Sequence, residues 1–295
     1  MTNLNALTID VEDYFHVAAF RMNITKDEWA KYQTRADRNT FHVLDLLDEK
    51  KVKGTFFVLG WLAEKMPAIV REIRNRGHEV ASHGYGHDLI YTMKPAEFRN
   101  DIVRAKTLLE DIIGERILGY RAPSFSITRA SLWALDQLIE AGFLYDSSIF
   151  PIYHDLYGMP EVDPFPHKIR REGGEIMEFP ASTMKVKIFK GKSVAIPISG
   201  GGYLRLLPLW VIKRGLRRVN LIDKQPAVIY FHPWELDPAQ PKIKCGIKSR
   251  FRHYYNLKGT EGKLKNLLES FRFAPMKTVL GFDPISSSND PDRRA

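Results

Sequence analysis

The sequence predicts an α/β fold with largely parallel strands, because short apolar runs alternate along the chain with longer amphipathic segments. The run 54–60 is apolar and bracketed by glycines, which is typical of a buried strand. Segments 38–49, 61–76 and 95–113 carry apolar residues at helical spacing, so we expect helices there. The same patterns predict a further helix at 131–141 and strands at 4–9, 79–82, 143–145 and 227–231.

The chain is predicted to consist of a main domain, residues 1–240, and a C-terminal extension, residues 241–285, packed on it. Between 149 and 199 the alternating pattern gives way to prolines, glycines and short β-like runs, which indicates a loop-rich insertion. The extension is basic and carries an amphipathic helix near 263–271. Residues 286–295 are polar, and we expect them to be disordered.

The composition is that of a globular protein, with 44% hydrophobic and 27% charged residues among 295. Cys245 is the only cysteine, which excludes an intramolecular disulfide and a cysteine-rich zinc module. The sequence contains no stretch of about 18 apolar residues, the length that a membrane-spanning helix requires. The first residues lead into acidic side chains rather than a secretory signal. We therefore expect a soluble, cytoplasmic protein.

The net charge of +9 favours an anionic partner, such as an acidic glycan, a membrane surface or a lipid-pyrophosphate carrier. Nucleic acid is not expected, because no nucleic-acid-binding motif accompanies the charge. Within 198–220, Lys213 and Arg214 follow a run of apolar residues that includes Trp210. This mixture suits a helix lying on an anionic membrane, and an ordinary packed helix is the alternative. The sequence does not determine the oligomeric state.

Two clusters of potential metal ligands follow predicted strands, where the carboxyl ends of parallel strands place an active site. Asp10, Glu12 and Asp13 come directly after the first strand, and taken alone they could form a solvated turn. His83 and His87 lie in a glycine-containing loop after a later strand. Two histidines and one carboxylate leave coordination positions vacant, as at a catalytic zinc. A pair of surface histidines is the alternative interpretation.

Three further polar residues occupy similar positions. Arg121 precedes the rigid turn at Pro123 and could hold a carboxylate in a fixed orientation. Asp146 is followed by two serines, a pattern that by itself indicates a cap or a turn. His232 ends an apolar strand, which suits either a proton donor or a hydrogen-bonded core residue.

Taken in order, these residues belong to five short motifs: Thr8-Ile9-Asp10, His83-x-x-x-His87, Arg121-x-Pro123, Asp146-Ser147-Ser148 and Phe231-His232. Together they resemble the motifs of the polysaccharide deacetylase family, also called NodB homology or carbohydrate esterase family 4. Segments 10–15, 81–87 and 249–256 resemble the subgroup encoded with exosortase (PEP-CTERM) exopolysaccharide loci. The resemblance implies a distorted (β/α) barrel that binds one divalent metal ion, usually zinc.

The resemblance also implies a role for each motif. Asp10 would be the general base, with Arg121 orienting it. His83 and His87 would be metal ligands. His232 would be the general acid, and Asp146 would keep it charged.

The third metal ligand is open. The usual family motif has two adjacent aspartates, the second being the ligand, whereas Val11 follows Asp10 here. The ligand must then be Glu12 or Asp13. Alternation along a strand puts Asp10 and Glu12 on the same side, which favours Glu12.

The activity implied by the resemblance is that of a carbohydrate N-deacetylase. Such an enzyme would remove N-acetyl groups from amino sugars of a polysaccharide or lipid-linked glycan in exopolysaccharide biosynthesis. A metal-independent, allantoinase-like hydrolase of ureides is one alternative. A non-catalytic scaffold that binds glycans is the other.

Overall fold

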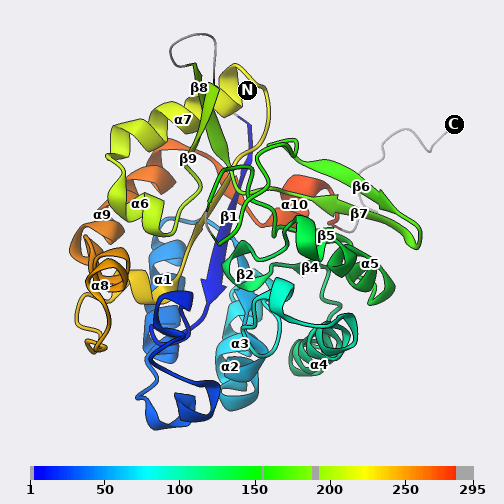
Figure 1. Ribbon diagram of the computed structural model, residues 1–295. Helices are drawn as coiled ribbons and strands as arrows, with labels where there is room; N and C mark the ends of the chain where they lie inside the picture. Colours follow the sequence, from blue (N-terminus) through cyan, green and yellow to red (C-terminus); the bar gives the residue numbers. More distant parts are fainter. Residues whose placement is uncertain (1–2, 155, 188–192, 284–295) are drawn as a thin grey trace, which may run out of the picture.

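The computed structural model describes residues 3–154, 156–187 and 193–283 (Figure 1). A nine-stranded sheet occupies its centre, in the order β10-β1-β2-β3-β4-β5-β7-β6, with β11 also paired to β1. Every neighbouring pair is parallel except β6 and β7. The predicted α/β fold with parallel strands is therefore confirmed. Its strands are β1 (Asn5–Val11), β2 (Thr55–Val58), β3 (Glu79–Ser82), β4 (Gly119–Tyr120), β5 (Tyr145–Asp146), β6 (His167–Arg171), β7 (Gly174–Glu178), β10 (Val228–Phe231) and β11 (Phe273–Ala274).

The sheet is strongly curved. In a flat sheet β1 and β4 would lie about 14 Å apart, since neighbouring strands are roughly 4.8 Å apart. Yet Arg121, the residue after β4, reaches across to hydrogen bond Thr8 and Asp10 on β1. The concave side of the sheet therefore encloses Arg121, as expected of a distorted barrel.

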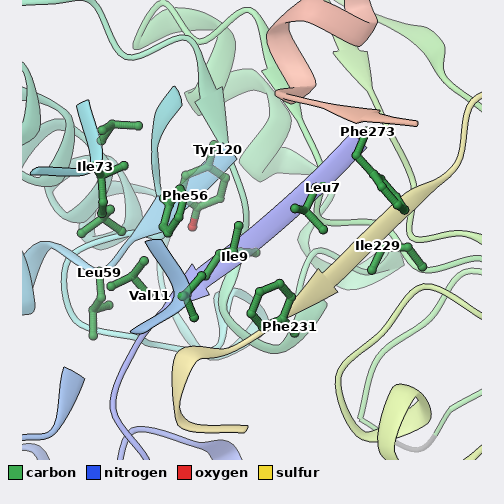
Figure 2. Close-up of a cluster of buried hydrophobic side chains, with 14 of the residues drawn as sticks. Leu7, Ile9, Val11, Phe56, Leu59, Ile73, Tyr120, Ile229, Phe231 and Phe273 are labelled. Carbon is green, nitrogen blue, oxygen red and sulfur yellow. The ribbon is translucent and has the colours of Figure 1, made fainter. Parts of the chain in front are cut away.

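Alternation along β1 divides its side chains between two environments. Leu7, Ile9 and Val11 belong to the large apolar cluster between the sheet and the helices (Figure 2). Thr8 and Asp10 have the opposite orientation and meet Arg121 on the concave side. The same strand thus supplies both the outer core and the polar interior.

Helices surround the sheet (Figure 1). The predicted helix 61–76 is wrong, because it is two helices separated at Met66. Pro67 lacks an N–H and begins the second helix, and Met66 has non-helical angles, φ −137° and ψ 59°. The helices are α1 (Ala36–Glu49), α2 (Gly60–Lys65), α3 (Pro67–Asn75), α4 (Pro95–Ile113), α5 (Trp133–Glu140), α6 (Gly202–Leu206), α7 (Leu209–Leu221), α8 (Ile247–Tyr254), α9 (Leu257–Ser270) and α10 (Met276–Leu280). None of them is long and apolar enough to cross a membrane.

The segment predicted to be a loop-rich insertion contains two hairpins. β6 and β7 add an antiparallel pair to the edge of the main sheet, and β8 (Thr183–Lys187) pairs with β9 (Ser193–Pro197) in a sheet of two strands. The extension from 241 onward is also integrated into the fold, because β11 pairs with Asn5 and Ala6 of β1. The predicted tail, 286–295, lies outside the described residues.

Gly119 allows β4 and β5 to approach closely. A Cβ atom at this position would lie 1.9 to 2.2 Å from ring atoms of Tyr145, which is fully buried. We expect Gly119→Ala to lower the free energy of unfolding by about 3 kcal/mol, since the ring cannot move without disturbing the core. Gly262→Ala is the matched control, because the Cβ would meet open space in α9 and should stabilise the helix by about 0.5 to 1 kcal/mol. Urea unfolding of both variants checks this, and equal effects would contradict it.

Candidate active site

Four parallel strands bring their carboxyl ends to the same edge of the sheet. Asp10 and Glu12 come from the end of β1, His83 follows β3, Arg121 follows β4 and His232 follows β10. All except His232 are at most 2% exposed. The structure therefore brings these five predicted residues to one edge of the sheet.

Glu12, His83 and His87 form a group that fits a divalent metal ion. Each offers one ligand atom, and these atoms lie within 4.8 Å of one another. His83 Nδ1 donates to the carbonyl oxygen of Arg121 at 2.8 Å, which leaves its Nε2 free to bind a metal. Burial lowers the pKa of His83 to about 4, so the ring is neutral, as a ligand must be.

The loop between the two histidines turns their rings toward each other. Gly84 and His87 both have left-handed backbone angles, with φ of 72° and 52°. His87 Nε2 lies 2.5 Å from an oxygen of Glu12, and the two imidazole rings are 5.4 Å apart. Burial raises the pKa of Glu12, but the neighbouring histidines outweigh it and hold the pKa well below its usual range. Glu12 is thus an anionic donor beside imidazole nitrogens.

Asp13 is not part of this group, because backbone N–H groups occupy both of its oxygens. Oδ1 accepts from the N–H of Tyr14 at 2.9 Å, and Oδ2 accepts from the N–H groups of Arg35 at 2.7 Å and Ala36 at 3.0 Å. These bonds tie the loop after β1 to the start of α1. Of the two carboxylates left open by the sequence, the structure makes Glu12 the candidate ligand and gives Asp13 a structural role.

Arg121 holds Asp10 in one orientation. Its Nη1 donates to Asp10 Oδ1 at 2.7 Å and to Thr8 Oγ1 at 2.8 Å. Its Nε and Nη2 donate to the backbone oxygen and hydroxyl of Ser147 at 3.1 and 2.9 Å, and the guanidinium lies over the ring of Phe57. Four hydrogen bonds and a ring contact fix this side chain. The arrangement matches the predicted orienting role of Arg121.

His232 faces the carboxylates with one nitrogen and is held by the other. Its Nε2 lies 3.6 Å from Glu12 Oε1 and 3.9 Å from Asp10 Oδ2, and its Nδ1 is 2.9 Å from Glu235 Oε2. Burial alone would lower the pKa of His232, but Glu12, Glu235 and Asp10 outweigh it and raise the pKa to about 9. The imidazole is therefore charged at neutral pH and can donate a proton from Nε2.

The prediction that Asp146 keeps His232 charged is wrong, because Glu12, Glu235 and Asp10 raise the pKa of His232 and Glu235 is the one that contacts its Nδ1. The sequence His232-Pro233-Trp234-Glu235 folds into a short helical turn in which the Glu235 side chain returns to the backbone N–H of His232. This is the reciprocal contact of a capping box, with His232 in the first position. Glu235 lies three residues after His232, and this capping-box spacing was the sequence signal that could have identified it.

Asp146 instead forms a buried pair with Glu178. Ser148 Oγ donates to Asp146 Oδ1, the N–H of Ile149 donates to Glu178 Oε1 at 3.1 Å, and the remaining oxygens, Asp146 Oδ2 and Glu178 Oε2, are buried without any other donor, so a proton on one carboxyl group is needed to join the two. Burial raises the pKa of Asp146 to about 6 and that of Glu178 well above its usual range. The pair therefore shares a proton and supports the turn that holds Arg121.

Comparison with known proteins gives matches along most of the chain. The polysaccharide deacetylase family matches residues 23–139, and a domain of unknown function (DUF3473) matches residues 147–281. A peptidoglycan-N-acetylglucosamine deacetylase of Bacillus cereus is 38% identical over 96 residues, covering 32% of this chain and 35% of that protein. A chitooligosaccharide deacetylase of Bradyrhizobium is 36% identical over 63 residues, covering 21% of this chain and 29% of that protein. The matches thus span about a third of these curated relatives.

A solved structure from Mycobacterium smegmatis, described as a candidate polysaccharide deacetylase, has the same fold. It aligns with a TM-score of 0.63 and 21% identity, covering 95% of this chain and 90% of that one. The family match and the curated relatives assign residues 23–139 to the polysaccharide deacetylase family, and the solved structure shows that the chain shares its fold.

The contacts of Glu12 and Asp13 predict opposite effects for two isosteric substitutions. Glu12→Gln should weaken zinc binding about 100-fold or more, because a neutral amide replaces an anionic ligand. Asp13→Asn should keep zinc affinity within a few-fold and lower the free energy of unfolding by about 1 to 3 kcal/mol, because its NH₂ cannot accept from backbone N–H groups. Chelator competition and urea unfolding measure the two quantities. Zinc binding lost in Asp13→Asn without a loss of stability would reverse the assignment.

The shared proton of Asp146 and Glu178 predicts a dependence of stability on pH. Because burial raises both pKa values, the folded protein keeps a proton that the unfolded chain releases above about pH 4. The contribution of the pair to stability therefore falls as the pH rises through this range. Glu178→Gln donates the same hydrogen bond without taking up a proton. In urea unfolding, the free energy of unfolding of this variant should exceed that of wild type by about 1 kcal/mol or more at pH 8, and by little at pH 4.

Glu175→Gln on the same strand is the matched control, since Glu175 is exposed and paired with Lys168. If the free energy of unfolding of Glu178→Gln differs from that of wild type by the same amount at every pH, the pair shares no proton.

Proposed function

We propose that this protein is a metal-dependent carbohydrate N-deacetylase that hydrolyses N-acetyl groups on amino sugars. One observation carries the proposal: the ligand group formed by Glu12, His83 and His87 lies beside a fixed carboxylate, Asp10, and a charged imidazole, His232. Hydrolysis of an amide needs a base for the attacking water and an acid for the departing amine. Both are within reach of one metal site.

The donor set suits zinc, which we propose as the ion. Zinc binds imidazole nitrogen and carboxylate oxygen, and catalytic zinc sites typically have three protein ligands and an open position. When bound, the ion would polarise the acetamide carbonyl and lower the pKa of a water molecule.

Asp10 supplies the base in this proposal. Its Oδ1 is engaged by Arg121, so Oδ2 is the oxygen available to take a proton from the attacking water. The ion pair fixes the direction in which Oδ2 points.

His232 supplies the acid. The proton on Nδ1 is held by Glu235, so the proton on Nε2 is the one transferred to the departing nitrogen. Cleavage of the C–N bond then leaves acetate and a free amino sugar. Base and acid come from neighbouring strands, Asp10 from the end of β1 and His232 from the residue after β10.

Acetate release from N-acetylglucosamine oligomers tests this function. We expect wild type to lose release after chelation and to recover it on addition of zinc or cobalt, and His83→Ala to remain at least about 100-fold slower. Release that persists in strong chelator would favour metal-independent ureide hydrolysis, and stoichiometric metal binding without release would require a different substrate. Glycan binding without metal or release would favour a scaffold.

We further propose that the protein acts in exopolysaccharide biosynthesis, at the cytoplasmic face of the membrane, on a carrier-linked glycan. The resemblance of segments 10–15, 81–87 and 249–256 to the exosortase-associated subgroup supports the pathway. The outer side of α7 supports a membrane contact. Trp210 is 68% and Leu221 61% exposed, and Arg214 and Arg217 are exposed between them at helical spacing.

Vesicle binding tests the membrane contact. Reversing the charge in Arg214→Glu should reduce binding to vesicles with anionic lipid about tenfold or more, since each basic residue near such a surface contributes about 1 kcal/mol. Arg71→Glu, an exposed position on α3, makes the same charge change and should have a smaller effect. Equal binding by both variants and wild type would refute the contact.

A further inference from the structure

Arg205 is buried without belonging to the group of acids and bases described above. It lies on α6, a helix of five residues, and is 4% exposed. Its Nε donates to Glu235 Oε1 at 2.6 Å, and its Nη1 donates to the carbonyl oxygens of His253 at 2.7 Å and Tyr255 at 3.2 Å. A buried guanidinium is stable only when it is paired in this way. Arg205 lies next to Glu235, the partner of His232, and this location indicates its role.

Glu235 is shared between Arg205 and His232. The side chain is fully buried, and its two oxygens have different partners: Oε1 accepts from Arg205, while Oε2 accepts from the Nδ1 and the backbone N–H of His232, both at 2.9 Å. A carboxylate held at both oxygens has one orientation. Arg205 therefore fixes the direction from which Glu235 contacts the imidazole ring.

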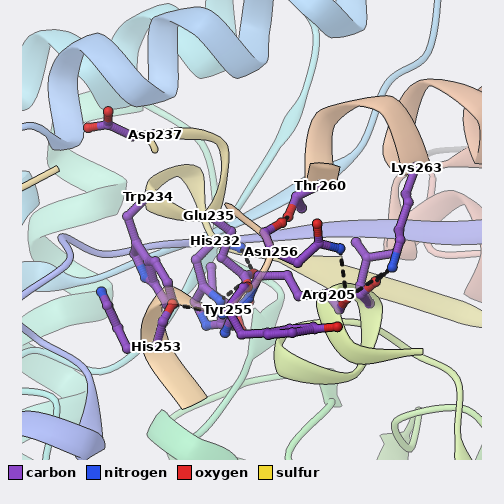
Figure 3. Close-up of polar contacts among 12 residues, drawn as sticks. Arg205, His232, Trp234, Glu235, Asp237, His253, Tyr255, Asn256, Thr260 and Lys263 are labelled. Carbon is purple, nitrogen blue, oxygen red and sulfur yellow. Dashed lines mark hydrogen bonds and ion pairs between the residues drawn. The ribbon is translucent and has the colours of Figure 1, made fainter. Parts of the chain in front are cut away.

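The C-terminal extension holds Arg205 in turn (Figure 3). His253 and Tyr255, at the end of α8, supply two of its acceptors. Lys263 on α9 donates to three carbonyl oxygens at the end of α6 at 2.7 to 3.0 Å, and Asn256 Nδ2 donates to the Arg205 oxygen at 3.0 Å. A helix this short is not stable alone. Contacts from α9 therefore fix the backbone that carries Arg205.

A second set of contacts connects the extension with His232. The ring of Trp234 stacks between His232 and His253, with ring centres 5.2 and 4.3 Å apart and planes within 22° and 15° of parallel. His253 Nε2 is 2.7 Å from Gln240 Oε1, which fixes the outer ring of the stack. Both the face and the Nδ1 edge of His232 are thus supported by residues that the extension holds.

We propose that Arg205 and the extension that holds it position the proton-donating half of the active site, so that the second matched segment, 147–281, completes the site. This inference rests on the proposed function. Arg205 acts through Glu235 on the orientation of His232, and among the described residues it contacts Glu235, Trp234 and the extension rather than Glu12, His83 or His87. Its removal should therefore affect protonation of the leaving group while leaving the metal ligands and the base in place.

Two substrates separate positioning of the acid from a purely structural role. N-acetylglucosamine oligomers release an amine that must be protonated, whereas p-nitrophenyl acetate releases a phenolate that leaves without a proton. For zinc-loaded Arg205→Gln we expect kcat on the oligomer to fall about 100-fold with KM within about threefold, and ester hydrolysis to stay within about threefold of wild type. Arg205→Lys keeps the charge but not the planar guanidinium, and its kcat should be intermediate.

Lys263→Met provides a second route to the same effect, because it removes the contacts that fix α6 without touching Glu235. We expect a smaller loss of amide hydrolysis, about tenfold, again without a loss of ester hydrolysis. Arg171→Gln is the control, since it breaks an arginine–carboxylate pair with Asp136 away from the site. It should keep both activities.

Zinc content and thermal unfolding of each variant complete the experiment. Unchanged amide hydrolysis in Arg205→Gln overturns the inference, and so does an equal loss on both substrates. Wild type that binds zinc and hydrolyses neither substrate overturns the proposed function together with the inference. An active wild type with an unaffected Arg205→Gln overturns the inference alone.

Discussion

The buried ion pair between Arg121 and Asp10 determines most of the geometry of the site. Asp10 lies on β1 and Arg121 follows β4, two strands that a flat sheet would keep apart, so the pair and the curvature of the sheet depend on each other. The same arginine accepts a hydrogen bond from His83 through its carbonyl oxygen. One residue therefore orients both the candidate base and a candidate metal ligand. Because the pair is buried, loss of either partner would leave an uncompensated charge in the interior.

Charges of opposite sign alternate through the site from Arg121 to Arg205. Arg121 neutralises Asp10, His232 lies between Asp10, Glu12 and Glu235, and Arg205 neutralises the far side of Glu235. This alternation explains how Glu12 and Glu235 remain ionised although burial raises the pKa of each. Where it is missing, as at Asp146 and Glu178, the carboxyl groups keep a proton instead.

The sequence predicted the parts of the structure that follow from local patterns. Alternating apolar segments identified the parallel strands, and polar residues after those strands identified Asp10, Glu12, His83, Arg121 and His232 as neighbours. It favoured Glu12 as the third ligand but left Asp13 open, because the role of Asp13 depends on N–H groups of Arg35 and Ala36, far along the chain. The family motif led to Asp146 as the partner of His232, whereas a short turn brings Glu235 into contact with His232 instead. The break at Met66 and the hairpins within 149–199 were missed, because the apolar spacing continues across Pro67 and the β-like runs are short.

The pairing of β1 has a consequence for the order in which the protein can fold. β1 pairs with β2 nearby in sequence, but its other neighbours are β10 and β11, and Asn5 is paired with Phe273. At ribosomal rates of about 5 to 20 residues per second, the N-terminal strand must wait roughly 15 to 50 seconds for its last neighbour to be translated. During that time one side of an apolar strand lacks its native partners. The nascent chain is therefore open to strand pairing with other molecules until the last part of the extension has left the ribosome.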